Sequence, residues 1–337
     1  MFSFLPGCRK IKVDMIQNQF VETYSKFIQK FLKPQKPLKI VFDCSDGTAG
    51  LVLKKIESPL NSKFYILNSK PDGHFPAHGP NPSKPGAAKQ LQAAVKKHKA
   101  DLGIIFDADG DRMLCADDKS RFVDSEVGAR LLIWHLKPKK IIIDATSGWL
   151  IKEIQSPRNQ EIEITESKVG QCFIKQKMRA ENADFGVERS GHYYFKKFFG
   201  LDSGILAAVE IINALSKLPY KFSDFVDLLP RYYRSEIDFK LSAPSINHQE
   251  LLKKTEDCFK SKVENYKLLK ISHLDGLTME FGDKIGFASR SLGEGWWFNL
   301  RFSNTEPLLR LNVETKSQLE LKKQVAVLVK FIEANQL

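Results

Sequence analysis

Apolar residues recur every three to four positions along residues 13–32, which predicts an amphipathic helix that ends before Pro34. A short apolar run at 38–42 then stops at a polar stretch containing glycine, which predicts a strand followed by a turn. Such runs alternate with helix-like segments to about residue 230. Further strands are predicted at 64–67, 102–106, 140–144 and 162–165, and further helices at 48–56, 87–99, 130–136, 170–180 and 203–218. This alternation is typical of α/β domains.

The pattern changes from about residue 235. A linker-like stretch at 242–245 precedes a charged helix predicted at 249–266. Strands are then predicted one after another, at 267–272, 277–281, 285–290, 296–302 and 308–314, before a last amphipathic helix. We therefore expect two similar α/β domains, with mixed sheets flanked by helices, followed by a smaller α+β domain. Their expected limits are 13–118, 119–235 and 245–337.

Composition narrows the protein class. The 337 residues are 42% hydrophobic and 27% charged, which excludes global disorder. They contain neither an uninterrupted apolar run of about 18 residues nor the basic start of a secretory signal. We therefore expect a cytoplasmic protein that does not associate with membranes. The five cysteines include no CxxC pair, which argues against a zinc site.

The formal net charge of +12 favours anionic partners in general. However, the lysines are dispersed among Glu and Gln, and no block of five or six like charges occurs. We expect a solvated, lysine-rich surface and no nucleic-acid partner.

The strongest chemical motif follows the strand predicted at 102–106. Asp107, Asp109 and Asp111 alternate along an extended loop, so their carboxylates point the same way. Three converging carboxylates are tolerated when a cation neutralises them, and oxygen ligands suit Mg²⁺ better than Zn²⁺. An EF-hand loop is disfavoured because Arg112 occupies the position of its required glycine. An Asp-x-Asp site of a nucleotide-sugar transferase and an exposed acidic turn remain alternatives.

Two other motifs offer groups for a phosphorylated sugar. In residues 186–192, Glu188 and Ser190 could bind neighbouring hydroxyls, and His192 could donate to a phosphate or move a proton. In residues 301–307, with Arg310 beyond, arginines, hydroxyls and an amide form a candidate phosphate cradle. The alternatives are an ordinary loop for the first motif and a turn stabilised by Arg–Glu pairing for the second.

The three motifs, in this order, resemble those of the α-D-phosphohexomutase family, which includes phosphomannomutases and phosphoglucomutases. Shorter stretches are also similar to that family, namely 43–50, the proline-rich 75–82, 168–170 and 202–205. The resemblance covers about residues 13–337 and corresponds to the second, third and fourth domains of the family.

The resemblance implies a role for each motif. The aspartates Asp107, Asp109 and Asp111 would hold Mg²⁺, and Arg112 and His192 would be catalytic residues beside the transferred phosphoryl group. Hexose phosphates would be bound by residues from three loops: Lys168, Gly170, Glu188, Ser190, Arg301, Ser303, Asn304, Thr305 and Arg310. The implied reaction interconverts hexose 1- and 6-phosphates through a phosphoserine and a bisphosphorylated intermediate.

One departure from the family pattern affects the expected activity. The family carries its phosphoserine in a Ser-His-Asn-Pro type loop of an N-terminal domain, and the 337 residues contain no such string. Gln171 also stands where family members often have His. We therefore expect a mutase whose phosphoserine comes from a separate polypeptide or another phosphoryl carrier. The alternative is a non-catalytic, hexose-phosphate-binding remnant.

Overall fold

The computed structural model describes residues 13–154, 162–240, 248–261, 266–283, 295–303 and 306–335. The chain divides into two compact units, one formed by residues 1–138 with 190–228 and the other by residues 139–189 with 229–337. Within the described ranges, no helix combines the length and the apolar character that crossing a membrane requires.

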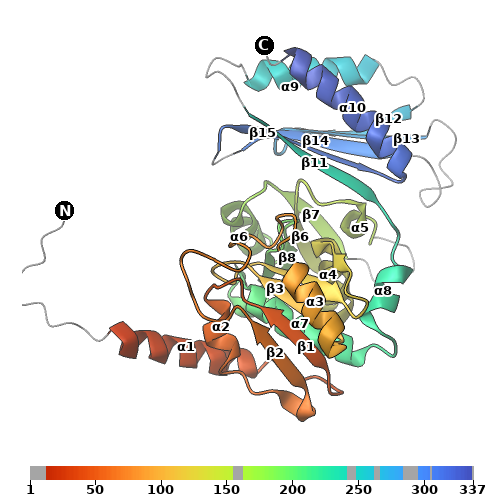
Figure 1. Ribbon diagram of the computed structural model, residues 1–337. Helices are drawn as coiled ribbons and strands as arrows, with labels where there is room; N and C mark the ends of the chain where they lie inside the picture. The colour runs from red at the N-terminus through yellow and green to blue at the C-terminus, as the bar shows by residue number, and fades with distance from the viewer. Residues whose placement is uncertain are drawn as a thin grey trace, which may run out of the picture. The chain divides into compact units, whose positions relative to one another are not determined.

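A five-stranded mixed sheet organises the first unit, with strand order β2-β1-β3-β4-β5 (Figure 1). The first three strands are parallel, and β4 and β5 are antiparallel to their neighbours. The strands are β1 (Lys39–Asp43), β2 (Lys63–Leu67), β3 (Leu102–Phe106), β4 (Met113–Asp117) and β5 (Phe122–Val123). Every residue of β3 is buried, as expected of a strand covered on both faces.

Helices pack on this sheet through apolar side chains. Leu91 and Val95 of helix α3 (Lys89–His98) join Val41 and Ile105 of the strands in one core cluster. Successive side chains of a strand point to opposite faces of the sheet, so Phe42 lies on the face opposite to Val41. Phe42 stacks there on Phe106, with ring centroids 6.3 Å apart. The helices of this unit are α1 (Val13–Gln29), α2 (Ala49–Leu53), α3 (Lys89–His98), α4 (Ser125–Leu136), α7 (Gly204–Lys217) and α8 (Phe222–Leu228).

The first unit also contains the short antiparallel pair β9 (Tyr193–Phe195) and β10 (Leu201–Asp202). The N-terminus of α7 follows β10 directly. Ser203 caps this helix, because its side chain accepts a hydrogen bond from the backbone N–H of Leu206 at 3.0 Å.

The second unit begins with three parallel strands, in which β6 (Lys140–Asp144) lies between β7 (Glu163–Ser167) and β8 (Phe185–Val187). Helix α6 (Gln171–Ala180) packs on all three strands, and the single-turn helix α5 (Trp149–Lys152) follows β6.

A five-stranded antiparallel sheet forms the C-terminal part of the second unit, with strand order β11-β15-β14-β13-β12. Its strands are β11 (Tyr233–Lys240), β12 (Tyr266–Ser272), β13 (Leu277–Asp283), β14 (Trp296–Phe302) and β15 (Leu308–Thr315). Helices α9 (His248–Ser261) and α10 (Gln318–Asn335) both lie on one side of it (Figure 1). Phe281 and Trp296 stack in its core, with ring centroids 4.3 Å apart.

These sheets confirm the expected fold class of two α/β domains followed by a smaller α+β domain. The strands expected at 102–106, 140–144 and 296–302 have the expected limits. The structure adds β4, β5, α5, α8 and β11, and it begins α4 at Ser125 where position 130 was expected. The strand expected at 285–290 and the linker at 242–245 lie outside the described residues. The domain limits stay predictions.

Phe42 is 1% exposed, so Phe42→Ala would leave a cavity between the sheet and its helices. We expect the free energy of unfolding to fall by about 3–5 kcal/mol. Urea denaturation followed by circular dichroism measures this change. Phe20→Ala is the matched control, since Phe20 is 70% exposed. Equal stabilities of the two variants would contradict the packing described for Phe42.

Candidate functional site

The turn between β1 and α2 supports the loop that carries the three aspartates. β1 and β3 are parallel neighbours, so their carboxyl ends meet at one edge of the sheet. The Ser45 hydroxyl donates to the Phe106 carbonyl at 2.5 Å, and the Thr48 N–H donates to the Ala108 carbonyl at 2.8 Å. A side chain at Gly47 would place Cβ 2.2 Å from that Ala108 oxygen, so the close approach requires glycine.

The same turn has an unusual backbone. Ser45 and Asp46 both have positive φ, at 52° and 54°, in the left-handed region that costs non-glycine residues energy. Hydrogen bonds hold them there, because the Asp46 N–H donates to the Asn68 carbonyl at 3.0 Å and Ser45 binds Phe106. The turn is therefore a rigid support for the aspartate loop.

Asp107 is the buried member of the aspartate cluster. Its Oδ1 accepts the backbone N–H groups of Gly110 and Arg112, each at 3.1 Å, and its Oδ2 accepts Arg112 Nε at 2.6 Å. Burial raises the pKa of Asp107 to about 6, and the charge of Asp111 adds to this shift, while Arg112 opposes it. Ionised Asp107 is thus an energetically costly group that a nearby cation would stabilise.

The three carboxylates do converge. Asp107, Asp109 and Asp111 each offer an oxygen, and these oxygens lie within 4.8 Å of one another. Asp109 is exposed and Asp111 is half-buried, so the group is open to solvent on one side. An all-oxygen donor set with one open side fits a hard divalent cation that retains water or a phosphate oxygen. The sequence expectation that these residues lie together is met, and their role as ligands is a prediction.

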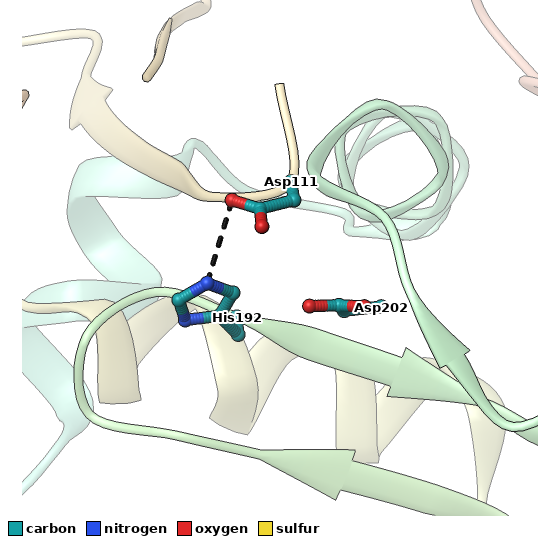
Figure 2. A group of neighbouring side chains, drawn as sticks. All are labelled: Asp111, His192 and Asp202. Carbon is teal, nitrogen blue, oxygen red and sulfur yellow. Dashed lines mark ion pairs between the residues drawn. The ribbon is translucent and has the colours of Figure 1, made fainter. Parts of the chain in front are cut away.

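His192 joins the same group from a distant part of the sequence (Figure 2). Arg112 and His192 form an isolated β-bridge, and the Met113 N–H donates to the Gly191 carbonyl at 3.0 Å. This pairing brings His192 Nε2 to 3.4 Å from Asp111 Oδ1. The Ser190 hydroxyl lies 2.7 Å from His192 Nδ1 and so orients the ring.

Asp202 is a candidate site residue that the sequence analysis did not single out. Its carboxylate, with Asp111 and His192, forms a second group whose possible ligand atoms lie within 4.8 Å of one another (Figure 2). Asp202 ends β10, immediately before the cap of α7. The available signal was the similarity of residues 202–205 to a family turn, which gave no reason to place the carboxylate beside His192.

In the second unit, Glu188 joins two of the expected substrate loops. Its Oε1 accepts the backbone N–H of Gly170 at 2.7 Å, and the side chain is nearly fully buried. Lys168 is exposed next to Gly170, with its ammonium 5.7 Å from the ring centroid of Phe173. The expected Lys168–Gly170 and Glu188 loops therefore form one connected structure.

The candidate phosphate cradle sits where β14 leads into β15. Arg301 and Arg310 are directly opposite each other on these strands, so both side chains project from the same face of the sheet. Arg310 pairs with Glu306 at 2.6 Å and with Asp238 at 3.3 Å. Arg301 is 7% exposed, and its Nε has no hydrogen-bond partner among the described residues. Two adjacent guanidinium groups with such a buried donor fit an anion.

Ser303 shapes the beginning of this cradle. Its N–H donates to the Leu308 carbonyl at 2.8 Å, and its hydroxyl accepts the Glu306 N–H at 3.3 Å. The other two expected binding residues of this loop, Asn304 and Thr305, lie outside the described residues.

The structure groups the expected site residues by unit. The first unit brings together Asp107, Asp109, Asp111, Arg112, Ser190 and His192. The second unit holds Lys168, Gly170, Glu188, Arg301, Ser303 and Arg310.

Three family models match this chain. They are phosphoglucomutase/phosphomannomutase α/β/α domain II over residues 18–120, α/β/α domain III over residues 119–232, and the C-terminal domain of the same family over residues 259–330.

Similar proteins carry related names. A phosphomannomutase of Methanocaldococcus jannaschii is 31% identical over 94% of this chain and 66% of its own length. A phosphomannomutase of Escherichia coli K12 is 32% identical over 86% of this chain and 61% of its own length. This chain therefore spans less than two thirds of either relative. Among solved structures, a phosphoglucomutase/phosphomannomutase family protein of Burkholderia thailandensis aligns with a TM-score of 0.75 and 23% identity, covering 94% of this chain and 64% of that one. At that identity the likeness concerns the fold.

The raised pKa of Asp107 predicts how cation binding depends on pH. A proton on this carboxyl competes with the cation, so affinity for Mn²⁺, used as a probe, should fall as the pH drops through about 6. An unperturbed Asp, with a pKa near ~3.9, would leave the affinity unchanged at that pH. Titrations between pH 7.5 and 5 measure this effect.

Two variants control this experiment. Asp107→Asn should bind Mn²⁺ weakly at every pH, and Asp257→Asn, at an exposed position on α9, should behave as the unsubstituted protein. An affinity that stays constant from pH 7.5 to 5 would show that Asp107 is not a ligand.

Proposed function

Because the chain belongs to the phosphoglucomutase/phosphomannomutase family, we propose that it acts in the interconversion of hexose 1- and 6-phosphates by phosphoryl transfer. One observation carries the proposal: Arg112 and His192, from motifs 80 positions apart, lie together beside the three aspartates. A cationic donor, an imidazole and a candidate cation site are the groups that transfer of a charged phosphoryl group requires.

We assign Asp107, Asp109 and Asp111 to Mg²⁺. When bound, the ion supplies positive charge that offsets the developing charge on the transferred phosphoryl group. Arg112 donates its Nε to Asp107, so its guanidinium is oriented beside the aspartates. We propose that the remaining guanidinium N–H groups bind the transferred phosphoryl oxygens.

His192 is suited to hold or accept a proton at Nε2. Asp111 Oδ1 lies 3.4 Å from this atom, and the Ser190 hydroxyl lies 2.7 Å from Nδ1 and fixes the ring. We propose that His192 acts on the hydroxyl that receives or releases the phosphoryl group, and that Ser190 also contacts the sugar.

The second unit supplies groups for the rest of the substrate. We propose that Arg301, Arg310, Ser303 and the neighbouring Asn304 and Thr305 bind the phosphate that is not transferred. The buried Nε of Arg301 supports this assignment, because it has no partner within the described part of the chain and a buried guanidinium donor without a partner costs free energy that an anion recovers. Glu188, Lys168 and Gly170 would contact the sugar or its phosphate.

The phosphoryl donor is a separate question, because the 337 residues contain no Ser-His-Asn-Pro string. We propose that a phosphoserine domain outside these residues, or another phosphoryl carrier, supplies the phosphoryl group. The alternative function is hexose-phosphate binding without turnover.

Turnover distinguishes the two functions. The protein is assayed with Mg²⁺, glucose 1-phosphate or mannose 1-phosphate and a trace of the hexose 1,6-bisphosphate, with and without an added phosphoserine-domain polypeptide. We expect turnover that Asp109→Ala lowers by about 10²–10³-fold, since it removes electrostatic stabilisation of the transferring group. Asp257→Ala is the control for loss of one exposed carboxylate. Binding without turnover, both with and without the added polypeptide, would contradict the enzyme hypothesis and support the binding function.

The phosphate cradle has its own test. Arg310→Gln should weaken glucose 6-phosphate binding about 10- to 100-fold, because it removes charge-assisted hydrogen bonds to the phosphate. Isothermal titration calorimetry measures the dissociation constant. Arg179→Gln makes the same charge change on the exposed face of α6 and should leave the affinity unchanged. Equal affinities of the two variants would remove Arg310 from the cradle.

A further inference from the structure

A carboxylate of the C-terminal sheet binds the backbone of the Lys168–Gly170 loop. Asp275 lies in the turn between β12 and β13, and its Oδ2 accepts the backbone N–H of Val169 at 3.0 Å. Val169 stands between Lys168 and Gly170, the two residues of this loop that we assign to the substrate. Both partners belong to the second unit, so the contact lies inside one compact body.

The turn that carries Asp275 is fixed against the strand that leads into the phosphate cradle. Asn299 of β14 is fully buried, and its Nδ2 donates to the Asp275 carbonyl at 2.9 Å. Gly276 has a φ of 75°, and a Cβ there would lie 2.2 Å from the Leu300 oxygen and 2.7 Å from Arg301 Cα. The backbone of the turn therefore lies directly on the last residues of β14, and Asp275 is joined to the strand that carries Arg301.

The other side of the Lys168–Gly170 loop is tied to the sugar motif. Gly170 donates its N–H to Glu188, whose neighbour Arg189 donates from Nη1 to Asn312 Oδ1 at 2.7 Å. Asn312 is buried on β15, two positions after Arg310. Two separate links, one through Asp275 and one through Arg189, thus connect the sugar-binding loops to the strands that bear the phosphate-binding arginines.

We propose that Asp275 is a positioning residue that sets the register between the Lys168–Gly170 loop and the phosphate cradle. It thereby selects ligands in which a phosphate and a set of hydroxyls are held at the separation found in a hexose monophosphate. Inorganic phosphate needs the cradle alone and gains nothing from this register. The inference rests on the proposed function, since it assumes that both loops bind one substrate.

The test compares two ligands and two substitutions. In Asp275→Ala, the affinity for glucose 6-phosphate should fall about tenfold, because the loop loses its preorganised position. The affinity for inorganic phosphate and the melting temperature should change little. Asp275→Asn should restore most of the hexose-phosphate affinity, because the amide oxygen can accept the Val169 N–H. Asp257→Ala serves as the matched control within the same sheet-and-helix layer.

A second measurement needs no ligand. In the unsubstituted protein the Val169 amide should exchange slowly with solvent deuterium, and Asp275→Ala should accelerate its exchange. The inference is overturned if both ligands lose affinity equally, if neither does, or if Asp275→Ala leaves Val169 exchange unchanged. Failure of the unsubstituted protein to bind glucose 6-phosphate contradicts the proposed function instead, and the exchange of Val169 then decides whether the Asp275 contact forms.

Discussion

The geometry of the candidate site in the first unit depends on the hydrogen bonds that the buried carboxylate of Asp107 accepts. It accepts two backbone N–H groups of its own loop and the Nε of Arg112, and so it defines both the path of the loop and the direction of the arginine. Arg112 in turn pairs with His192 through the backbone. Burial makes the ionised carboxylate costly, and the hydrogen bonds from Arg112 oppose that cost. One buried carboxylate therefore positions the candidate cation site, the Arg112 guanidinium and, through Arg112, the His192 imidazole.

A second buried carboxylate plays a comparable part in the other unit. Glu314 of β15 is fully buried and pairs with Arg234. Its Oε1 also accepts the backbone N–H of Trp149 at 2.8 Å and Trp297 Nε1 at 2.9 Å. These bonds hold the start of α5 against the C-terminal sheet. Removing one partner of a buried charge with this many contacts would destabilise the fold. The contacts of Glu314 therefore give the α/β layer and the sheet a defined orientation within this unit.

Sequence reasoning recovered the elements and contacts that arise from local pattern. Short apolar runs bounded by polar residues gave β3 and β6 with correct limits, and the alternating aspartates were expected to converge. β11 was not predicted because Tyr233–Lys240 is mostly polar. It forms a strand because it pairs with β15 along its whole length. The first turn of α4 was not predicted because Gly128 weakens the helical pattern. The helix begins there because Asp124 caps it by accepting the Glu126 N–H at 2.9 Å. Asp202 and Asp275 could not be found from spacing, since their roles depend on partners distant in sequence.

The turn at Ser45 and Asp46 limits which amino-acid substitutions this part of the chain can accept. Two successive residues in left-handed conformations store strain of about 1–3 kcal/mol each, and glycine at either position would release it. At position 45 the same replacement also removes the hydroxyl that donates to the Phe106 carbonyl, so the relief of strain is offset by the loss of a buried hydrogen bond. A residue at position 45 therefore has to satisfy two demands at once, since it must adopt a left-handed backbone and still reach the Phe106 carbonyl with a short polar side chain.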